Sequence, residues 1–183
     1  MSITTHALPH DDYISAVTDA LTCGGLDTTD HTWTDDCDTR GTYCYLNAVL
    51  TLDPSGTVTS GDDAERSNWP YGLLLIWEWH TGAEADQGEP ERGPQWLFAE
   101  LRSDGSNEYP TELPVPGYAS PAAVVDAARQ VISREIRPGS FHTSAQPQWA
   151  GGIIGAPWDG ATELNAACEA WGAAETHDSK AIA

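Results

Sequence analysis

Residues 71–80 read YGLLLIWEWH, and this stretch decides the fold because it has the pattern of a long, buried strand. Successive side chains of a strand point to opposite faces of the sheet. One face begins at Leu73 and continues with leucine and tryptophan, whereas the other begins with Leu74 and Ile76. A strand that is apolar on both faces belongs in the interior of a sheet. We therefore place residues 71–80 at the centre of the predicted sheet.

Two further strands and two helices are indicated on either side of this segment. Residues 41–53 place apolar side chains on one face and both polar and apolar side chains on the other, which predicts a strand. Residues 95–102 are predicted to form a third strand. Residues 11–23 carry apolar side chains at helical spacing, and Ser120-Pro121 is a typical helix start. The order helix, strand, strand, strand, helix predicts an α+β fold. We expect an antiparallel meander of three to four strands, with the N-terminal and C-terminal helices packed on one face.

The remaining segments are predicted to be irregular. Residues 26–40 are rich in Thr and Asp, which indicates a loop, and the prolines of residues 108–119 indicate an extended arm. We expect residues 1–138 to form a single α+β domain. Residues 139–183 are predicted to form a Gly- and Pro-rich tail that ends in a helix from residue 162 to about residue 175.

The composition is strongly acidic, which excludes several classes of partner. The 183 residues include 28 Asp and Glu against 8 Lys and Arg, a formal net charge of −20. Such a chain repels phosphate groups, so we expect no direct binding to nucleic acid or to an anionic membrane. The sequence lacks the run of about 18 apolar residues that a membrane span needs. Its polar N-terminus does not resemble a signal peptide, so we expect a soluble, cytoplasmic protein.

Several segments together carry a resemblance to a group of known proteins. These are residues 72–80 (GLLLIWEWH), 93–100 (GPQWLFAE) and 104–110 (DGSNEYP), followed by residues 113–116 (LPVP) and the Ser120-Pro121 helix start. They resemble small proteins of unknown function from streptomycetes and their phages or plasmids, over residues 10–136. The resemblance implies a GC-rich actinobacterial source and a cytoplasmic location. It assigns no functional residue.

Three side chains could support acid–base chemistry. Glu78 and His80 lie two residues apart and so share one face of the central strand, and Glu100 on the next strand could approach them. A small hydrolase is therefore one alternative function. The competing interpretation is an outer sheet face with ordinary polar pairs between strands, which alternation alone predicts. The familiar nucleophile and nucleotide-binding motifs are absent from the sequence, so a non-enzymatic role is favoured and we expect no cofactor.

Three cysteines and one histidine are candidate metal ligands. Cys23, His31, Cys37 and Cys44 could in principle gather around zinc, which binds Cys and His in a tetrahedron. Their spacings of eight, six and seven residues match no common zinc-binding pattern. We therefore expect reduced thiols and no metal site.

Acidic residues cluster beside aromatic ones in two segments, and this is the feature with the clearest functional implication. Residues 1–39 hold eight acids, and residues 53–91 hold nine acids and one Arg. The predicted partner-binding residues are Trp33, Asp35, Asp36, Asp38, Asp62, Asp63, Glu65, Trp69 and Tyr71. The leading hypothesis is a non-enzymatic acidic protein that binds a basic protein, for example as a nucleic-acid-mimicking inhibitor from a phage or mobile element.

Two other interpretations of the acidity stay open at this point. The charge could serve only solubility or salt adaptation, without any partner. A structural role, as an accessory protein of a phage particle or another assembly, is the second alternative function. In that case the chain would associate with copies of itself, so a homo-oligomer is not excluded.

Overall fold

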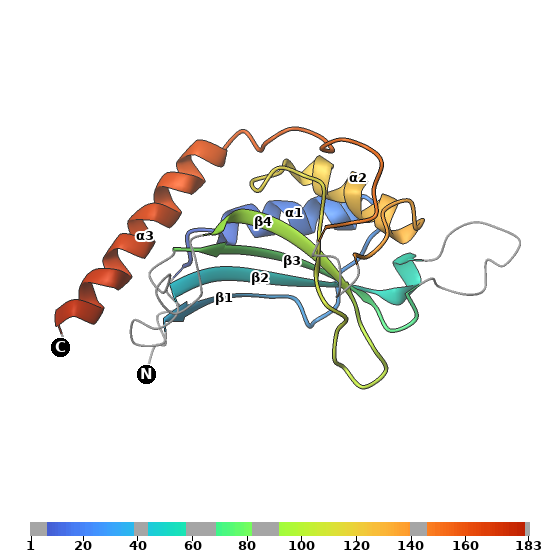
Figure 1. Ribbon diagram of the computed structural model, residues 1–183, viewed down its shortest axis with the longest axis horizontal. Helices are drawn as coiled ribbons and strands as arrows, with labels where there is room; N and C mark the ends of the chain where they lie inside the picture. Colours follow the sequence, from blue (N-terminus) through green and yellow to red (C-terminus); the bar gives the residue numbers. More distant parts are fainter. Residues whose placement is uncertain (1–6, 39–43, 58–68, 82–91, 140–145, 182–183) are drawn as a thin grey trace, which may run out of the picture.

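The computed structural model describes residues 7–38, 44–57, 69–81, 92–139 and 146–181, and these form an α+β structure (Figure 1). The elements in chain order are α1 (Asp11–Cys23), β1 (Trp33–Asp38), β2 (Cys44–Leu52), the 3-10 turn η1 (Pro54–Thr57), β3 (Leu73–His80), β4 (Arg92–Glu100), β5 (Thr111–Glu112), α2 (Pro121–Ile132) and α3 (Ala161–Ala181). The predicted fold class is therefore confirmed.

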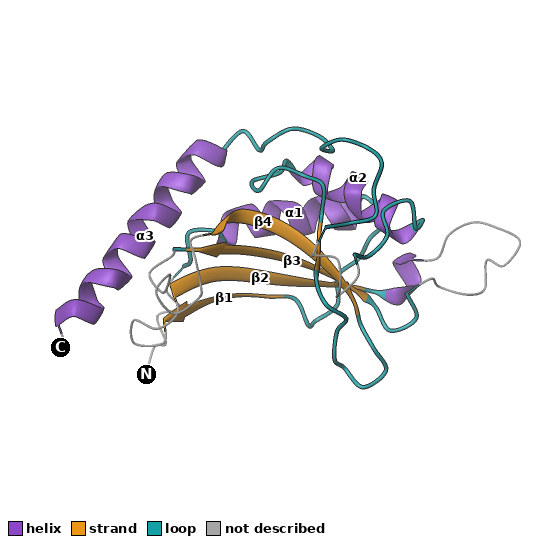
Figure 2. Cartoon of the chain, in the orientation of Figure 1, coloured by secondary structure: helices purple, strands orange, loops and turns teal. Residues whose placement is uncertain are grey.

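The sheet is an antiparallel meander in the order β1-β2-β3-β4-β5. Figure 2 shows β1, β2, β3 and β4 side by side, with α1 and α2 on one side of them and α3 at one end. The central position predicted for residues 71–80 is confirmed, because β3 lies between β2 and β4. The pairing of Ala48 with Trp77 and of Trp77 with Trp96 sets the register of the buried face.

Strand β1 falls in the segment predicted to be a loop and β5 in the predicted extended arm, so the sheet has five strands instead of three to four. The sequence of β1, WTDDCD, lacks the apolar alternation that indicates a strand, and half of its residues are Asp, which is depleted in strands. Charged residues are typical of an edge strand, where they discourage pairing with other chains. Backbone pairing with β2 creates this strand, and side-chain pattern alone could not predict it.

The buried face of the sheet is covered by α1 and α2, and Tyr13 of α1 lies at the middle of this core. Its side chain is completely buried. The Tyr13 hydroxyl donates to the carbonyl of Ala119 at 2.8 Å and accepts from the Trp96 indole at 3.0 Å. The Tyr13 ring also contacts Trp77 edge-on, with ring centres 6.1 Å apart. One side chain therefore links the helix layer, the sheet and the chain leading into α2.

The extended arm and the tail pack against each other over the same core. Trp77 donates its indole N–H to the Gly117 carbonyl at 3.0 Å, which fixes the arm on the sheet. The backbone amide of Trp158 donates to the Tyr118 carbonyl at 2.7 Å. The Trp158 ring lies 5.0 Å from the Tyr13 ring, between centres. In Figure 1 the segment from residue 146 to α3 runs over the helix layer before it reaches the far end of the sheet.

The N-terminal half of helix α3 contacts the sheet. Leu164 and Cys168 are buried, and Trp171 meets Trp79 edge-on at 6.5 Å between ring centres. Gly172 lies so close to Thr81 that an added Cβ would come within 2.8 Å of its methyl group. The glycine therefore allows the helix to approach the end of β3. The predicted terminal helix is present and extends to Ala181.

His10, immediately before α1, is a buried histidine whose side chain forms one hydrogen bond within the described structure. Its ring stacks on Trp77 at 5.1 Å between centres, and Nε2 donates to the Asn47 carbonyl at 2.8 Å. Nδ1 has no hydrogen-bond partner among the described residues. Burial lowers the pKa of His10, against the raising effects of the Asn47 bond and of nearby Asp11 and Asp36. Burial thus favours the neutral form of the imidazole in the folded protein.

Replacing Tyr13 with Phe tests the linking role of the hydroxyl. Phe keeps the ring but leaves a buried indole N–H and a buried carbonyl without this partner, so the free energy of unfolding should fall by about 1–3 kcal/mol. Urea denaturation measures the change. Tyr71→Phe, at an exposed tyrosine, is the control and should change stability by less than about 0.5 kcal/mol. Equal effects of the two substitutions would contradict this role.

The buried His10 predicts a loss of stability on acidification. The ordinary pKa is 6.5, and the folded state lowers it, so below pH 6.5 the unfolded chain takes up a proton that the folded chain refuses. Stability from this group is complete above pH 6.5 and falls as the pH drops towards the folded pKa. The slope is at most about 1.4 kcal/mol per pH unit. His10→Gln should flatten the stability profile between pH 6.5 and pH 5.5, and an unchanged slope would refute the assignment.

Candidate functional site

Strand β1 forms an edge of the sheet and carries acidic side chains. Within the part of the chain that the structure describes, β1 pairs with β2 alone. In an antiparallel pair, backbone N–H groups alternate between pointing towards the neighbouring strand and away from it. The Asp36 amide donates to the Asp35 side chain at 2.9 Å. In β2, the Thr51 carbonyl accepts from the Thr29 amide at 2.8 Å, so alternate residues of β2 from Thr51 back to Val49 and Asn47 direct their backbone groups towards the β1 side, where they pair with Trp33 and Asp35. Asp36 and the residue two positions before it, Thr34, thus direct their backbone N–H and C=O groups towards the open edge.

A groove of about 410 Å³ lies between this edge and α1. It is lined by Asp11, Ile14, Ser15, Thr18, Asp19, Thr32, Trp33 and Thr34. These residues include two carboxylates and four hydroxyl groups but no Lys or Arg. The groove is therefore polar and negatively charged, with a helix as one wall and a strand edge as the other.

Asp11 fixes the position of α1 relative to β1. One of its carboxylate oxygens accepts from the Leu8 amide at 2.7 Å, close to the start of the helix. The other accepts from the Thr34 hydroxyl at 2.8 Å. Both oxygens are used, so Asp11 holds the groove at its present width. The exposed carboxylates next to the groove are those of Asp12, Asp35 and Asp36.

Trp33 lies at the start of β1, on the face of the sheet that points away from α1. It pairs with Val49, which is in register with Ile76 of β3 and so belongs to that outer face. The Trp33 side chain is 45% exposed, which is high for so large an apolar ring. Asp35 follows it on the same face, since side chains alternate along a strand. The structure thus brings together Trp33, Asp35 and Asp36 at one edge.

The other predicted partner-binding residues have different outcomes. Asp38 is the last residue of β1, and its side chain lies outside the described structure. The whole of Asp62, Asp63 and Glu65 lies outside it. Tyr71 is exposed but lies in the turn before β3 begins at Leu73, whereas Trp33 is in register with Ile76, well inside β3. It does not belong to the β1 surface.

Trp69 is a correction, because its ring is completely buried and offers no surface to a partner. Its indole N–H donates to the Ile132 carbonyl at 3.4 Å, at the end of α2. The guanidinium of Arg134 lies over the ring, 3.6 Å from its centre. Arg134 adopts a left-handed φ of 63° there, a conformation usually left to glycine. Trp69 thus serves the core, and its acidic neighbours in sequence gave no sign of this.

The predicted acid–base set does not assemble. Glu78 and His80 do share a face, with Oε2 and Nε2 3.8 Å apart. Glu100, however, pairs with Leu73, five positions along β3 from Glu78, which corresponds to about 17 Å. An odd number of positions also places it on the opposite face, where it lies 3.8 Å from the Arg134 guanidinium. The predicted approach of Glu100 to this pair is therefore wrong.

The environment of Glu78 favours its charged form. Burial raises the pKa of the Glu78 carboxyl, but hydrogen bonds from His80 and Gln95 and the charges of His80 and Arg92 outweigh it, so the pKa is lowered. Gln95 donates to Glu78 at 2.5 Å, and Arg92 lies 3.7 Å away. A carboxylate held ionised cannot act as a proton donor near neutral pH. The cluster has the character of polar pairs between strands.

The cysteine and histidine set lies only partly within the described structure. Cys23 is exposed at the end of α1, and His31 precedes β1. Cys37 lies four positions beyond Trp33, about 13 Å along the strand, and it pairs with Tyr45, next to Cys44. The side chains of Cys37 and Cys44 lie outside the described part. Among the described residues, no group of three or more potential ligands could hold a metal ion.

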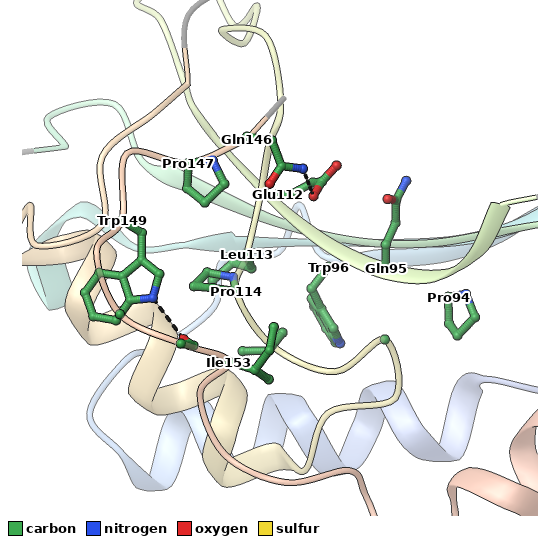
Figure 3. Close-up of a pocket in the computed structure, with 14 residues that line it drawn as sticks. Pro94, Gln95, Trp96, Glu112, Leu113, Pro114, Gln146, Pro147, Trp149 and Ile153 are labelled. Atoms are coloured by element: carbon green, nitrogen blue, oxygen red, sulfur yellow. Dashed lines mark hydrogen bonds between the residues drawn. The ribbon is translucent and has the colours of Figure 1, made fainter. Parts of the chain in front are cut away.

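Sequence reasoning missed a cavity of about 420 Å³ where the arm, β4 and the tail meet (Figure 3). Figure 3 shows Trp96, Pro114 and Ile153 around it, with Trp149 held by a hydrogen bond from its indole N–H to the Gly152 carbonyl at 3.0 Å. Its one lining carboxylate, Glu112, accepts a hydrogen bond from Gln146. The lining thus offers no pair of groups for acid–base or nucleophilic chemistry.

Comparison with protein-family models, with curated proteins and with solved structures finds no match to this chain. The resemblance to streptomycete and phage proteins therefore stays a prediction. In the described part of the chain, every helix is too short or too polar to cross a membrane. The β1 edge and its groove are the site that the geometry supports best.

Proposed function

We propose that this protein is a non-enzymatic acidic module that binds a basic protein through α1 and β1. The observation that carries the proposal is the open edge of β1, where exposed Trp33 lies beside Asp35 and Asp36 and next to an acidic groove. An aromatic anchor surrounded by charges of one sign is typical of a surface that selects an oppositely charged partner. A nucleic-acid-mimicking inhibitor from a phage or mobile element is one protein of this kind.

The distribution of charge supports a partner over a uniform effect on solubility. Residues 1–39, which contribute α1 and β1, hold eight acids and no Lys or Arg. By contrast, residues 92–139 hold five of the eight basic residues of the chain. A surface that is negative on one side steers a positive partner towards that side and speeds association at low salt. Salt screens such attraction over about 10 Å at 0.1 M, so the interaction should weaken as salt increases.

Affinity capture with matched variants tests this function. The wild-type chain, the double variant D35N/D36N and the control D126N/E135Q are immobilised and exposed to an actinobacterial lysate at low salt. Both variants remove two exposed carboxylates, but only the first changes the β1 edge. We expect one stoichiometric basic protein on the wild type and on the control, released between low and moderate salt. Its affinity for D35N/D36N should be about tenfold lower.

Two results would contradict the proposal. One is the retention of no basic protein at low salt, and the other is equal retention by the two double variants. Analytical ultracentrifugation of the chain alone then separates the remaining alternatives. Self-association at physiological salt would favour the structural role in an assembly, whereas a monomer would favour acidity as an adaptation of the surface.

A further inference from the structure

We propose that the basic partner supplies an extended segment that adds to β1 as a sixth strand, lying in the groove along α1. This inference rests on the proposed function and specifies how the partner is recognised. Recognition of this kind uses backbone hydrogen bonds for affinity and alternate side chains for specificity. The edge would thus recognise the backbone of an extended basic segment as well as its positive charge.

The backbone of β1 is prepared for such an addition. Thr34 and Asp36 direct their backbone N–H and C=O groups away from β2, and the Asp36 amide donates to the neighbouring Asp35 side chain. That exposed local bond can exchange for a bond to an incoming carbonyl. An edge strand with unpaired backbone groups is a template for another strand. At the opposite edge β5 has only two residues, which leaves β1 as the longer template.

The helix beside the edge matches the repeat of a strand. Asp11, Ser15 and Asp19 lie four residues apart on α1, and all three line the groove. Four helical residues rise about 6 Å, whereas two strand residues advance about 6.8 Å. Alternate side chains of an added strand would therefore meet successive turns of α1. Lys or Arg at every second position would face Asp11, Asp19 and Asp36, which lie on this side of β1.

Charge decides between a basic segment and a second copy of this chain. Pairing two β1 strands would bring Asp35 and Asp36 of one copy against the same residues of the other. Like charges directly opposite each other in a sheet are destabilising. The residues of β1 include three Asp and no basic residue, so the edge repels itself and attracts a Lys- or Arg-rich strand. The Trp33 ring, on the opposite face of β1, offers a further contact to those side chains of the added strand that do not face α1.

Peptides with blocked amides provide the test. The probe is a short, end-capped peptide in which lysine alternates with threonine. Two further peptides have the same sequence and charge, but one carries N-methyl groups on the lysine amides and the other on the threonine amides. If the peptide adds as an antiparallel strand with lysine facing α1, the lysine amides donate to β1. N-methylation of lysine should then weaken binding about fivefold or more, whereas N-methylation of threonine should have little effect.

Isothermal titration calorimetry at low salt gives the affinities. A parallel addition would reverse the order of the two methylated peptides, and either asymmetry supports an added strand. Equal affinities for all three peptides would overturn the strand addition while leaving an electrostatic binding function intact. Failure of all three to bind would overturn it too. In either case the affinity capture described above still tests the binding of a basic protein, because its outcome does not depend on an added strand.

A pair of variants tests the same idea from the side of the protein. Asp36→Asn and Asp36→Pro both remove the carboxylate, but only Pro removes the outward N–H. Proline is tolerated on edge strands when its missing N–H faces away from the sheet. We expect Asp36→Pro to bind the unmodified peptide about fivefold more weakly than Asp36→Asn, with equal thermal unfolding midpoints for the two variants. Equal peptide affinities of the two folded variants would contradict the proposal. If Asp36→Pro fails to fold, the methylated peptides decide.

Discussion

The rest of the structure depends on the two hydrogen bonds of the Tyr13 hydroxyl. The hydroxyl accepts from the Trp96 indole in β4 and donates to the Ala119 carbonyl before α2. Its ring also contacts Trp158 of the returning tail. The fixed position of Tyr13 sets the rotation of α1 about its axis. It thereby directs Asp11, Ser15 and Asp19 towards β1, where they line the groove.

The same acidic edge has two physical consequences. Carboxylates on β1 prevent the edge from pairing with a second copy of the chain, which would otherwise lead to aggregation. They also select a strand of opposite charge, because attraction and repulsion here come from the same side chains. Asp11 differs from the other acids, since its oxygens are bonded to Leu8 and Thr34. Its role is to hold the wall of the groove, whereas Asp19, Asp35 and Asp36 remain exposed.

Sequence patterns predicted the elements whose stability comes from their own apolar periodicity. The helix at residues 11–23, the central strand and the Ser120 cap belong to this group, and the cap hydrogen bond to the Ala123 amide is present. Strand β1 could not be predicted, because pairing with β2 stabilises it and its own side chains do not. The expected contact of Glu100 with Glu78 is wrong, because the register of β4 against β3 pairs Glu78 with Gln95, and residue type alone does not reveal that register.

The candidate site was predictable in part for the same reasons. Trp33, Asp35 and Asp36 are adjacent in sequence, so any extended conformation keeps them together at one edge. The groove needs α1 and β1 side by side, which depends on the long-range Asp11–Thr34 bond. The acids that precede Trp69 predict a surface position for it, whereas it packs into the core against Ile132 and Arg134, the latter 65 residues further along the chain.

Residue-resolved amide hydrogen exchange by NMR, on the protein alone, tests the open edge of β1 most directly. The account predicts alternating protection along the strand. The amides of Thr34 and Asp36 should exchange rapidly, and that of Asp35 should be protected by β2. Protection of Thr34 and Asp36 equal to that of Leu75 in the central strand would show that the edge is already occupied. That result would contradict the site, the strand addition and the function proposed from them.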